Sequence, residues 1–190
     1  MAGMDRNPRL NMLSGNNAEF LGEARWYACR TRARAEKQVD RLLVGAGFET
    51  YLPLVDRHRK WADRTKRVAF PLFPGYTFAR FSMGCFIDVV RTPGLVEVVG
   101  GADCPTPVRD EELEAVRRLT RGTQFTGTPP RLENDGWEPG TPVRVTEGPF
   151  RGMRGRLVEV RGATRLVVRL TAIRMAASVE LKPGMVRQVG

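Results

Sequence analysis

Residues 140–160 read GTPVRVTEGPFRGMRGRLVEV, and their pattern predicts the fold of the C-terminal part of the chain. Valines alternate with charged residues in two short runs, which is the pattern of half-buried β-strands. Gly148, Gly152 and Gly155 punctuate the runs, where a tight turn with positive φ favours glycine. Further valine-rich runs follow. About five strands in about 50 residues predict a small closed all-β barrel over 138–190, because closure leaves no exposed strand edge.

Two stretches outside this region lack hydrophobic periodicity. Residues 121–137 (RGTQFTGTPPRLENDGW) are rich in Gly, Thr, Pro and Asn, which predicts a flexible linker. Residues 1–22 are polar and contain turn formers, which predicts a disordered leader and no secretory signal. The remaining residues, 23–120, are predicted to form the first domain.

The first domain mixes both periodicities. A strand is expected at Trp26–Cys29, followed by a helix over 32–45 whose apolar residues recur at helical spacing. Acidic residues early and arginines late in 107–119 favour a second helix there. The other expected elements are strands at 48–55, 76–81 and 95–99 and a short helix at 86–90. The fold class predicted is α+β, an antiparallel sheet flanked by helices.

The charge of the chain favours a polyanionic partner. Lys and Arg number 31 against 21 Asp and Glu, a net charge of +10, which suits nucleic acid. The basic residues concentrate in 56–69, where alternation around a central turn predicts a projecting β-hairpin. Its candidate nucleic-acid-binding residues are Arg57, Arg59, Lys60, Trp61, Arg64, Lys66 and Arg67. Trp61 could stack on a base; the alternative is a solvated hairpin with Trp61 folded back.

The residues needed for catalysis or metal binding are sparse. Cys29, Cys85 and Cys104 lie far apart, and His58 is the only histidine. This set fits neither a structural zinc site nor a disulfide scaffold, so reduced buried thiols are expected. With no nucleophile–base set and no phosphate-binding glycine loop, we expect no enzyme, no cofactor and no metal. The apolar runs are too short for a membrane span, and a cytoplasmic location is expected.

Two motifs carry a family resemblance. Residues 71–78 (PLFPGYTF), with Trp26-Tyr27 before them and Arg91–Gly94 (RTPG) after them, resemble the N-terminal domain of NusG-type transcription elongation factors. Residues 140–160 resemble a KOW motif. Together the resemblance covers about residues 24–189. It implies an NGN-like polymerase-binding domain and a small SH3-like KOW barrel.

The resemblance also implies partners and binding residues. The first domain would dock on the clamp helices of RNA polymerase, and the basic hairpin would face upstream or non-template DNA. The implied polymerase-binding residues are Trp26, Phe73, Pro74, Gly75, Tyr76, Phe86, Val89 and Val90. Core positions are the alternative for some of them, Val89 above all. The factor would modulate pausing, processivity, antitermination or termination as a monomer.

The barrel would recruit a second partner, for which the resemblance implies Rho or a small-subunit ribosomal protein. The implied contact residues are Phe150, as an exposed anchor, with Arg151, Ile173 and Met175. Residues 173–181 (IRMAASVEL) depart from the common pattern, which leaves a specialised RfaH-like paralogue open. Residues 138–190 hold ten basic and four acidic residues, so nucleic-acid contact by the barrel is also open. The rival class is a ribosomal or RNA-binding structural protein that uses a KOW barrel.

Overall fold

The computed structural model describes residues 22–60, 65–101, 104–126, 130–134, 140–160, 163–182 and 184–189. The predicted leader therefore lies outside the described residues, except for Gly22. Within the described part, an antiparallel sheet forms the first unit in the order β2-β5-β1-β6, with β7 also paired to β1. These strands are β1 (Arg25–Thr31), β2 (Glu49–Tyr51), β5 (Tyr76–Phe81), β6 (Leu95–Val98) and β7 (Pro107–Val108).

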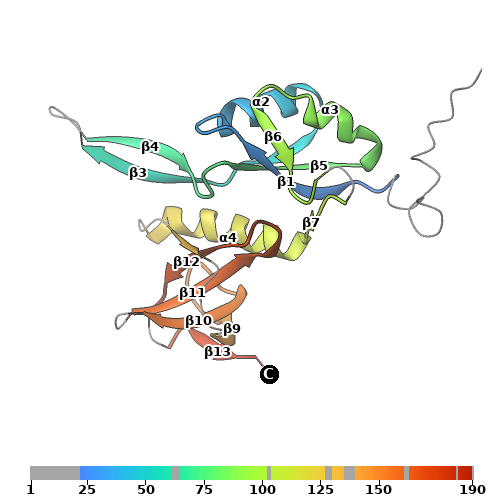
Figure 1. The fold of residues 1–190 in the computed structure, drawn as a ribbon. Coiled ribbons are helices and arrows are strands. Elements are labelled where there is room, and N and C mark those ends of the chain that lie inside the picture. The colour runs from blue at the N-terminus through green and yellow to red at the C-terminus, as the bar shows by residue number, and fades with distance from the viewer. Residues whose placement is uncertain are drawn as a thin grey trace, which may run out of the picture.

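Alternate residues of β1 enter two separate cores on the two faces of this sheet. Tyr27 and Cys29 pack with helices α2 (Glu36–Gly45) and α3 (Phe86–Val90), which follows the 3-10 turn η2 (Met83–Cys85). Trp26 and Ala28 pack with helix α4 (Asp110–Thr126) on the other face. Figure 1 shows α2 and α3 on one side of the sheet and α4 on the opposite side. The predicted α+β class with antiparallel pairing and flanking helices is confirmed.

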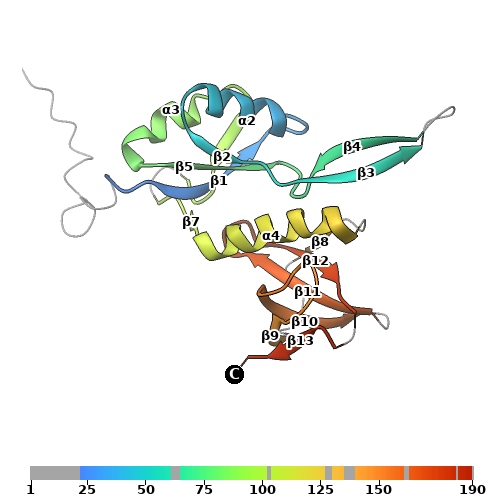
Figure 2. The same cartoon turned by 180° about the vertical axis from the view of Figure 1, so that it is seen from behind.

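The predicted basic hairpin is present as β3 (Leu54–Lys60) and β4 (Thr65–Pro71), which pair only with each other among the described strands. It extends beyond the main sheet in every view (Figures 1 and 2). The strand expected over 48–55 is in fact two strands, β2 and β3, divided at Pro53. Proline has no N–H for a ladder bond, which explains the break.

The prediction of a flexible linker over 121–137 is wrong where the structure describes it. Helix α4 continues through residues 121–126, and β8 (Arg131–Asn134) pairs with β12 (Met175–Glu180). Residues 127–129 and 135–137 lie outside the described residues. The helix extends because Leu113, Val116 and Leu119 anchor one side of it in the core, which outweighs the weak propensity of its last turns.

The C-terminal sheet is antiparallel, with its described strands in the order β13-β9-β10-β11-β12-β8. Its remaining elements are β9 (Thr141–Val145), β10 (Arg154–Val160), β11 (Ala163–Leu170), the 3-10 turn η3 (Thr171–Ile173) and β13 (Val186–Gln188). Gly148 and Gly152 have positive φ, as predicted from the turn. Gly155 does not; a Cβ there would lie 2.8 Å from Leu166 Cδ1, so close packing is what requires this glycine.

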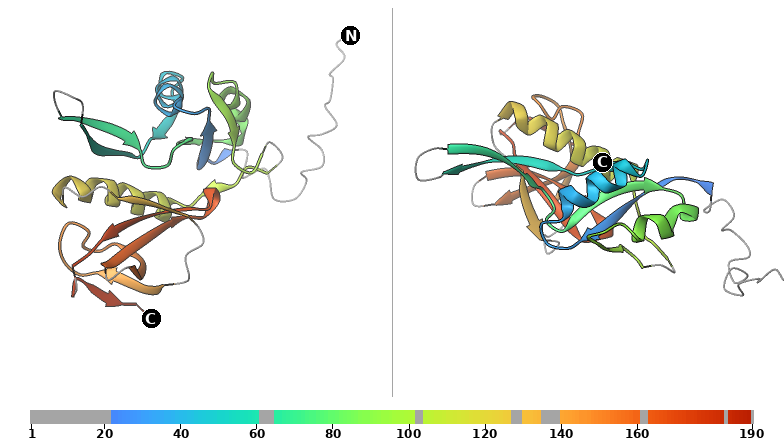
Figure 3. Two further views of the ribbon diagram at one scale, coloured as in Figure 1. Left: turned by 60° about the vertical axis from the view of Figure 1, so that its left-hand side comes forward. Right: turned by 90° about the horizontal axis from the view of Figure 1, so that it is seen from above.

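Helix α4 lies between the two sheets, as Figure 1 and the turned views of Figure 3 agree. Its buried residues belong to one apolar cluster that also contains Trp26 and Phe78 from the first sheet and Leu166 and Leu170 from the C-terminal sheet. The two sheets therefore share a core through α4.

Two further results concern the chemistry of the chain. Among the described residues, no helix is long and apolar enough to cross a membrane, and no cluster of His, Cys, Asp and Glu could hold a metal ion. Cys29 is buried, and burial raises the pKa of its thiol to about 12. Cys104 is exposed and Cys85 half-buried, so the expectation of three buried thiols is correct for Cys29 alone.

Candidate functional site

Two hydrogen bonds tie the loop Phe73–Tyr76 to the first unit, and a third closes the loop on itself. Gly75 has φ +83°, its N–H donates to Glu36 Oε1 at 2.7 Å, and its carbonyl accepts from Thr31 N at 2.8 Å. Tyr76 N donates to the carbonyl of Phe73 at 3.2 Å. Glu36 is itself only 6% exposed at the start of α2. This buried carboxylate holds the loop in one conformation.

Phe73 and Pro74 of this loop differ in exposure to solvent. Phe73 is fully buried and packs edge-on against Phe78, with 6.3 Å between the ring centroids. Pro74 is exposed, while Gly75 and Tyr76 are half-buried. Phe73 therefore anchors the loop in the core, and the side chains of Pro74 and Tyr76 are accessible to a partner.

The loop of residues 91–94 is tied to the same place. Arg32 N donates to the carbonyl of Gly94 at 2.8 Å, one residue after the bond from Thr31 to Gly75. Gly94 has φ +93°, and a Cβ there would come within 3.2 Å of Val39 in α2. The two sequence motifs of the first unit thus converge on the segment between β1 and α2.

The predicted polymerase-binding residues do not form one surface. Trp26 and Phe73 belong to the core on the α4 side of the sheet. Phe86, Val89 and Val90 belong to the core with α2 on the other side. Trp26, Phe73, Phe86 and Val89 are at most 8% exposed. The expectation of a single exposed patch is wrong, because β1 alternation sends its neighbours to opposite faces.

A cation–aromatic cluster covers the α4 side of the first sheet. The guanidinium carbon of Arg117 lies 5.0 Å from the ring centroids of both Trp26 and Tyr51. Tyr51 Oη is 3.0 Å from Thr120 Oγ1, also on α4. Burial raises the pKa of Tyr51, and the Thr120 hydrogen bond and the Arg117 charge oppose this shift. The Trp26 ring is therefore already in contact with a side chain of α4.

Phe150 lies in the interface between α4 and the C-terminal sheet. It is 3% exposed, and a Cβ on Gly122 of α4 would overlap its ring. Ile173 is also buried, Met175 is half-buried and Arg151 is exposed. The prediction of Phe150 as an exposed anchor is wrong, because α4 extends far enough to cover it.

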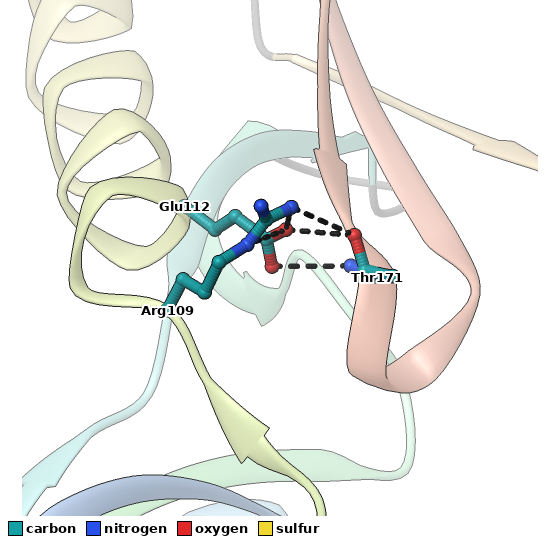
Figure 4. A network of polar contacts seen from close by, with 3 residues as sticks. All are labelled: Arg109, Glu112 and Thr171. Atoms are coloured by element: carbon teal, nitrogen blue, oxygen red, sulfur yellow. Dashed lines mark hydrogen bonds and ion pairs between the residues drawn. The ribbon is translucent and has the colours of Figure 1, made fainter.

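A polar network joins the same two elements (Figure 4). The Glu112 carboxylate accepts from Thr171 N at 3.1 Å, from Thr171 Oγ1 at 2.7 Å and from Arg109 Nε at 3.0 Å. Only 11% of the Glu112 side chain is exposed. Charge-assisted hydrogen bonds of this kind are stronger than neutral ones. The sequence analysis did not identify Glu36, Glu112 or Arg117 as residues that hold the loop or the α4 contacts. For Gly122, the one available signal was a glycine within a helix.

The hairpin residues with predicted nucleic-acid contacts are described only in part. The register pairs Arg57 with Val68, His58 with Arg67, Arg59 with Lys66 and Lys60 with Thr65. Trp61 and Arg64 lie outside the described residues. The roles assigned to this hairpin stay predictions.

The chain thus has two antiparallel sheets joined through one helix, with a preformed loop at the surface.

Residues 24–117 match the family described as "Transcription termination factor nusG". The chain is 30% identical over 184 residues to the transcription termination/antitermination protein NusG of Haemophilus influenzae, covering 89% of this chain and 96% of the relative. It therefore belongs to the NusG family.

Two further matches also cover most of this chain. The NusG protein of Pseudomonas aeruginosa is 29% identical over 178 residues, covering 87% of this chain and 98% of that protein. A solved structure titled "Domain interaction in Thermotoga maritima NusG" is 22% identical, with a TM-score of 0.49, and covers 88% of this chain and 98% of the other.

Proposed function

We propose that this protein is a transcription elongation factor that binds RNA polymerase at the clamp helices through its first unit. It modulates pausing and processivity, with termination or antitermination as the outcome. The relatives carry the names of transcription termination/antitermination proteins, and the family match covers the first unit. The observation that carries the proposal is the loop Phe73–Tyr76, which Glu36 and Thr31 hold in place.

A preformed loop suits a binding role. Its conformation is fixed before a partner arrives, so little ordering entropy is lost on association. Pro74 and Tyr76 offer apolar and aromatic surface, the composition found at the centres of protein interfaces. Phe73 acts from below as support, because it is fully buried.

The test is a pull-down with core RNA polymerase. The variant Pro74→Ala with Tyr76→Ala is expected to bind about tenfold more weakly, the effect of losing about 1.4 kcal/mol at an interface. A matched control is Ile87→Ala with Val96→Ala, which removes exposed apolar side chains from α3 and β6. Equal binding by wild type and the loop variant contradicts the proposal.

The basic hairpin is proposed to contact upstream or non-template DNA in the elongation complex. Its sequence supplies several basic residues, and phosphate contacts make such binding sensitive to salt. Charge reversal of Arg57, Arg59 and Lys60 is expected to remove hairpin–DNA crosslinks. Unchanged crosslinking would remove the DNA role from the hairpin.

The C-terminal sheet is proposed to be a KOW barrel that recruits Rho or a small-subunit ribosomal protein through Phe150, Arg151, Ile173 and Met175. Phe150 and Ile173 are buried, so recruitment through them requires the sheet to separate from α4. Pull-down of either partner by wild type and by a variant that weakens the α4 contact tests this step. Binding that does not increase in such a variant counts against it.

A further inference from the structure

Three arginines stand directly opposite one another across adjacent strands of the C-terminal sheet. The register pairs Arg187 of β13 with Arg144 of β9, and Arg144 with Arg154 of β10. Residues paired in this way point to the same face, with Cβ atoms about 5 Å apart. All three side chains are exposed. We call Arg187, Arg144 and Arg154 the arginine row.

No ion pair to the row is found among the described residues, although Arg154 and Arg156 line one hollow together with Glu111, Glu112 and Glu114 of α4. None of the ion pairs found in the described part of the chain includes Arg144, Arg154 or Arg187. Glu159 is on β10 but an odd number of residues from Arg154, so it points to the opposite face. Glu180 is paired across the sheet with Arg165.

Arg156 extends the positive face. It lies two residues after Arg154 on β10 and pairs with Pro142 of β9, so no acid opposes it there. Its guanidinium donates to the carbonyl of Gly140 at 2.8 Å, which keeps the side chain along the sheet. The row and Arg156 together place four positive charges on one face of three adjacent strands.

The stability of the fold does not explain this arrangement. Like charges directly opposite in an antiparallel pair repel each other and destabilise the sheet. The repulsion is relieved when a polyanion supplies the missing negative charges. Arginine suits phosphate in particular, because its planar fork can donate two parallel hydrogen bonds.

We propose that the arginine row, with Arg156, binds the phosphate backbone of duplex DNA. Strands lie about 4.8 Å apart, so the row spans about 10 Å, a length over which a duplex presents several phosphates. The surface is distinct from the hairpin β3–β4, and the proposal does not depend on polymerase binding.

The aromatic content of this region favours a duplex over a single strand. Proteins that bind single strands stack bases on aromatic side chains. Residues 140–189 contain one aromatic residue, Phe150, and it is buried against α4. Among the described residues of this region, the arginine face can therefore contact phosphates and offers no stacking platform. A duplex keeps its bases stacked internally and needs none.

The experiment measures binding of the full chain to a short random-sequence DNA duplex by fluorescence anisotropy over a salt series. The test variant is Arg144→Gln, Arg154→Gln and Arg187→Gln together. The control is Arg32→Gln, Arg41→Gln and Arg91→Gln together, which removes the same charge from exposed sites in the first unit. The hairpin is intact in both variants, so its contribution to binding is common to both.

The row variant is expected to bind about tenfold more weakly or worse, and the slope of log K against log salt should fall by about 2 to 3. The control should lose about twofold. Replacing the three arginines by lysine should retain most of the slope, because the charge remains; this also keeps the test valid if the glutamine variant folds poorly. Circular dichroism melting checks the fold of each variant.

Several results would overturn the proposal. Equal losses in the row and control variants would show a net-charge effect only. A row-dependent preference for single-stranded RNA or DNA over the duplex would reject the duplex as the ligand. Equally effective, row-dependent competition by an acidic polypeptide at matched charge would make the surface a protein-docking site instead.

Discussion

The ring of Phe150 lies against Gly122, a glycine inside α4 whose Cα has no room for a side chain on that side. Glycine costs a helix interior about 1 kcal/mol relative to alanine. Its presence here lets the C-terminal sheet approach α4 closely enough to bury Phe150. This contact is one of those that cover the surface around Phe150.

Gly122→Ala is therefore expected to weaken the contact between α4 and the C-terminal sheet. The added methyl group overlaps the Phe150 ring, and overpacking of this kind costs about 1–3 kcal/mol. The expected result is a larger radius of gyration in X-ray scattering and a faster-tumbling C-terminal unit in NMR relaxation. Gly45→Ala in α2 is the control, since a Cβ there meets nothing within 4 Å. Identical scattering from both variants would refute the steric role of Gly122.

Glu112 is expected to stabilise the same interface through its bonds to η3. Glu112→Gln removes the charge and one of the two acceptor oxygens, and Thr171 N then faces an amide. The free energy of unfolding should fall by about 1–3 kcal/mol in urea titrations. The neighbouring change Glu111→Gln, at an exposed position, should alter it by less than about 0.5 kcal/mol. Equal effects at the two positions would contradict the network.

Glu36 is expected to act as a positioning residue for the loop Phe73–Tyr76. Glu36→Ala removes the acceptor for Gly75 N–H, so the Gly75 amide should exchange with solvent about fivefold faster or more, the equivalent of about 1 kcal/mol. Glu36→Gln retains a carbonyl acceptor and should restore most of the protection. NMR measures the exchange rate of the Gly75 amide in the protein alone, so this test does not require polymerase. Unchanged exchange in the alanine variant would remove Glu36 from this role.

The buried thiol of Cys29 gives the protein an alkaline sensitivity. Its pKa is about 12 in the folded chain against a reference of 9.0, so the folded state retains a proton that the unfolded state loses. The free energy of unfolding is therefore unaffected by this thiol below pH 9, and it decreases as the pH rises from 9 through 12. At pH 10 this ionisation lowers the free energy of unfolding by about 1 kcal/mol.

Cys29→Ala isolates this effect. The variant lacks the ionisable thiol, so its free energy of unfolding should fall less than that of the wild type between pH 7 and pH 10, by the same amount of about 1 kcal/mol. Cys104→Ala serves as the control, because Cys104 is exposed. Parallel pH profiles for Cys29→Ala and the wild type would show that the Cys29 thiol does not contribute.

Most elements of the first unit could be predicted because each has a local signature. The strand at Trp26–Cys29, the strand Tyr76–Phe81 and the basic hairpin all occur where alternation and turn residues place them. The helix predicted from residue 32 begins at Glu36, because Arg34 has φ +64° and cannot continue a helix. Its Val39 and Leu43 are buried, while Leu42 is 41% exposed.

The candidate site was less predictable, for two physical reasons. Aromatic residues serve equally well as core and as interface, so sequence could not tell that Trp26 and Phe73 are buried while Pro74 is exposed. The carboxylates of Glu36 and Glu112 act on backbone groups 39 and 59 residues away, and no local pattern records such partners.

By itself, the sequence determined the class of each unit and the family, since periodicity, turn glycines and the two motifs are properties of neighbouring residues. The three arginines of the row can be read from the sequence, but their position opposite one another follows only from the strand pairing. The continuation of α4 into the expected linker and the burial of Phe150 between the two units follow only from tertiary packing. The physical reason is that a helix end of weak propensity is stabilised by what packs against it, and that partner is distant in the chain.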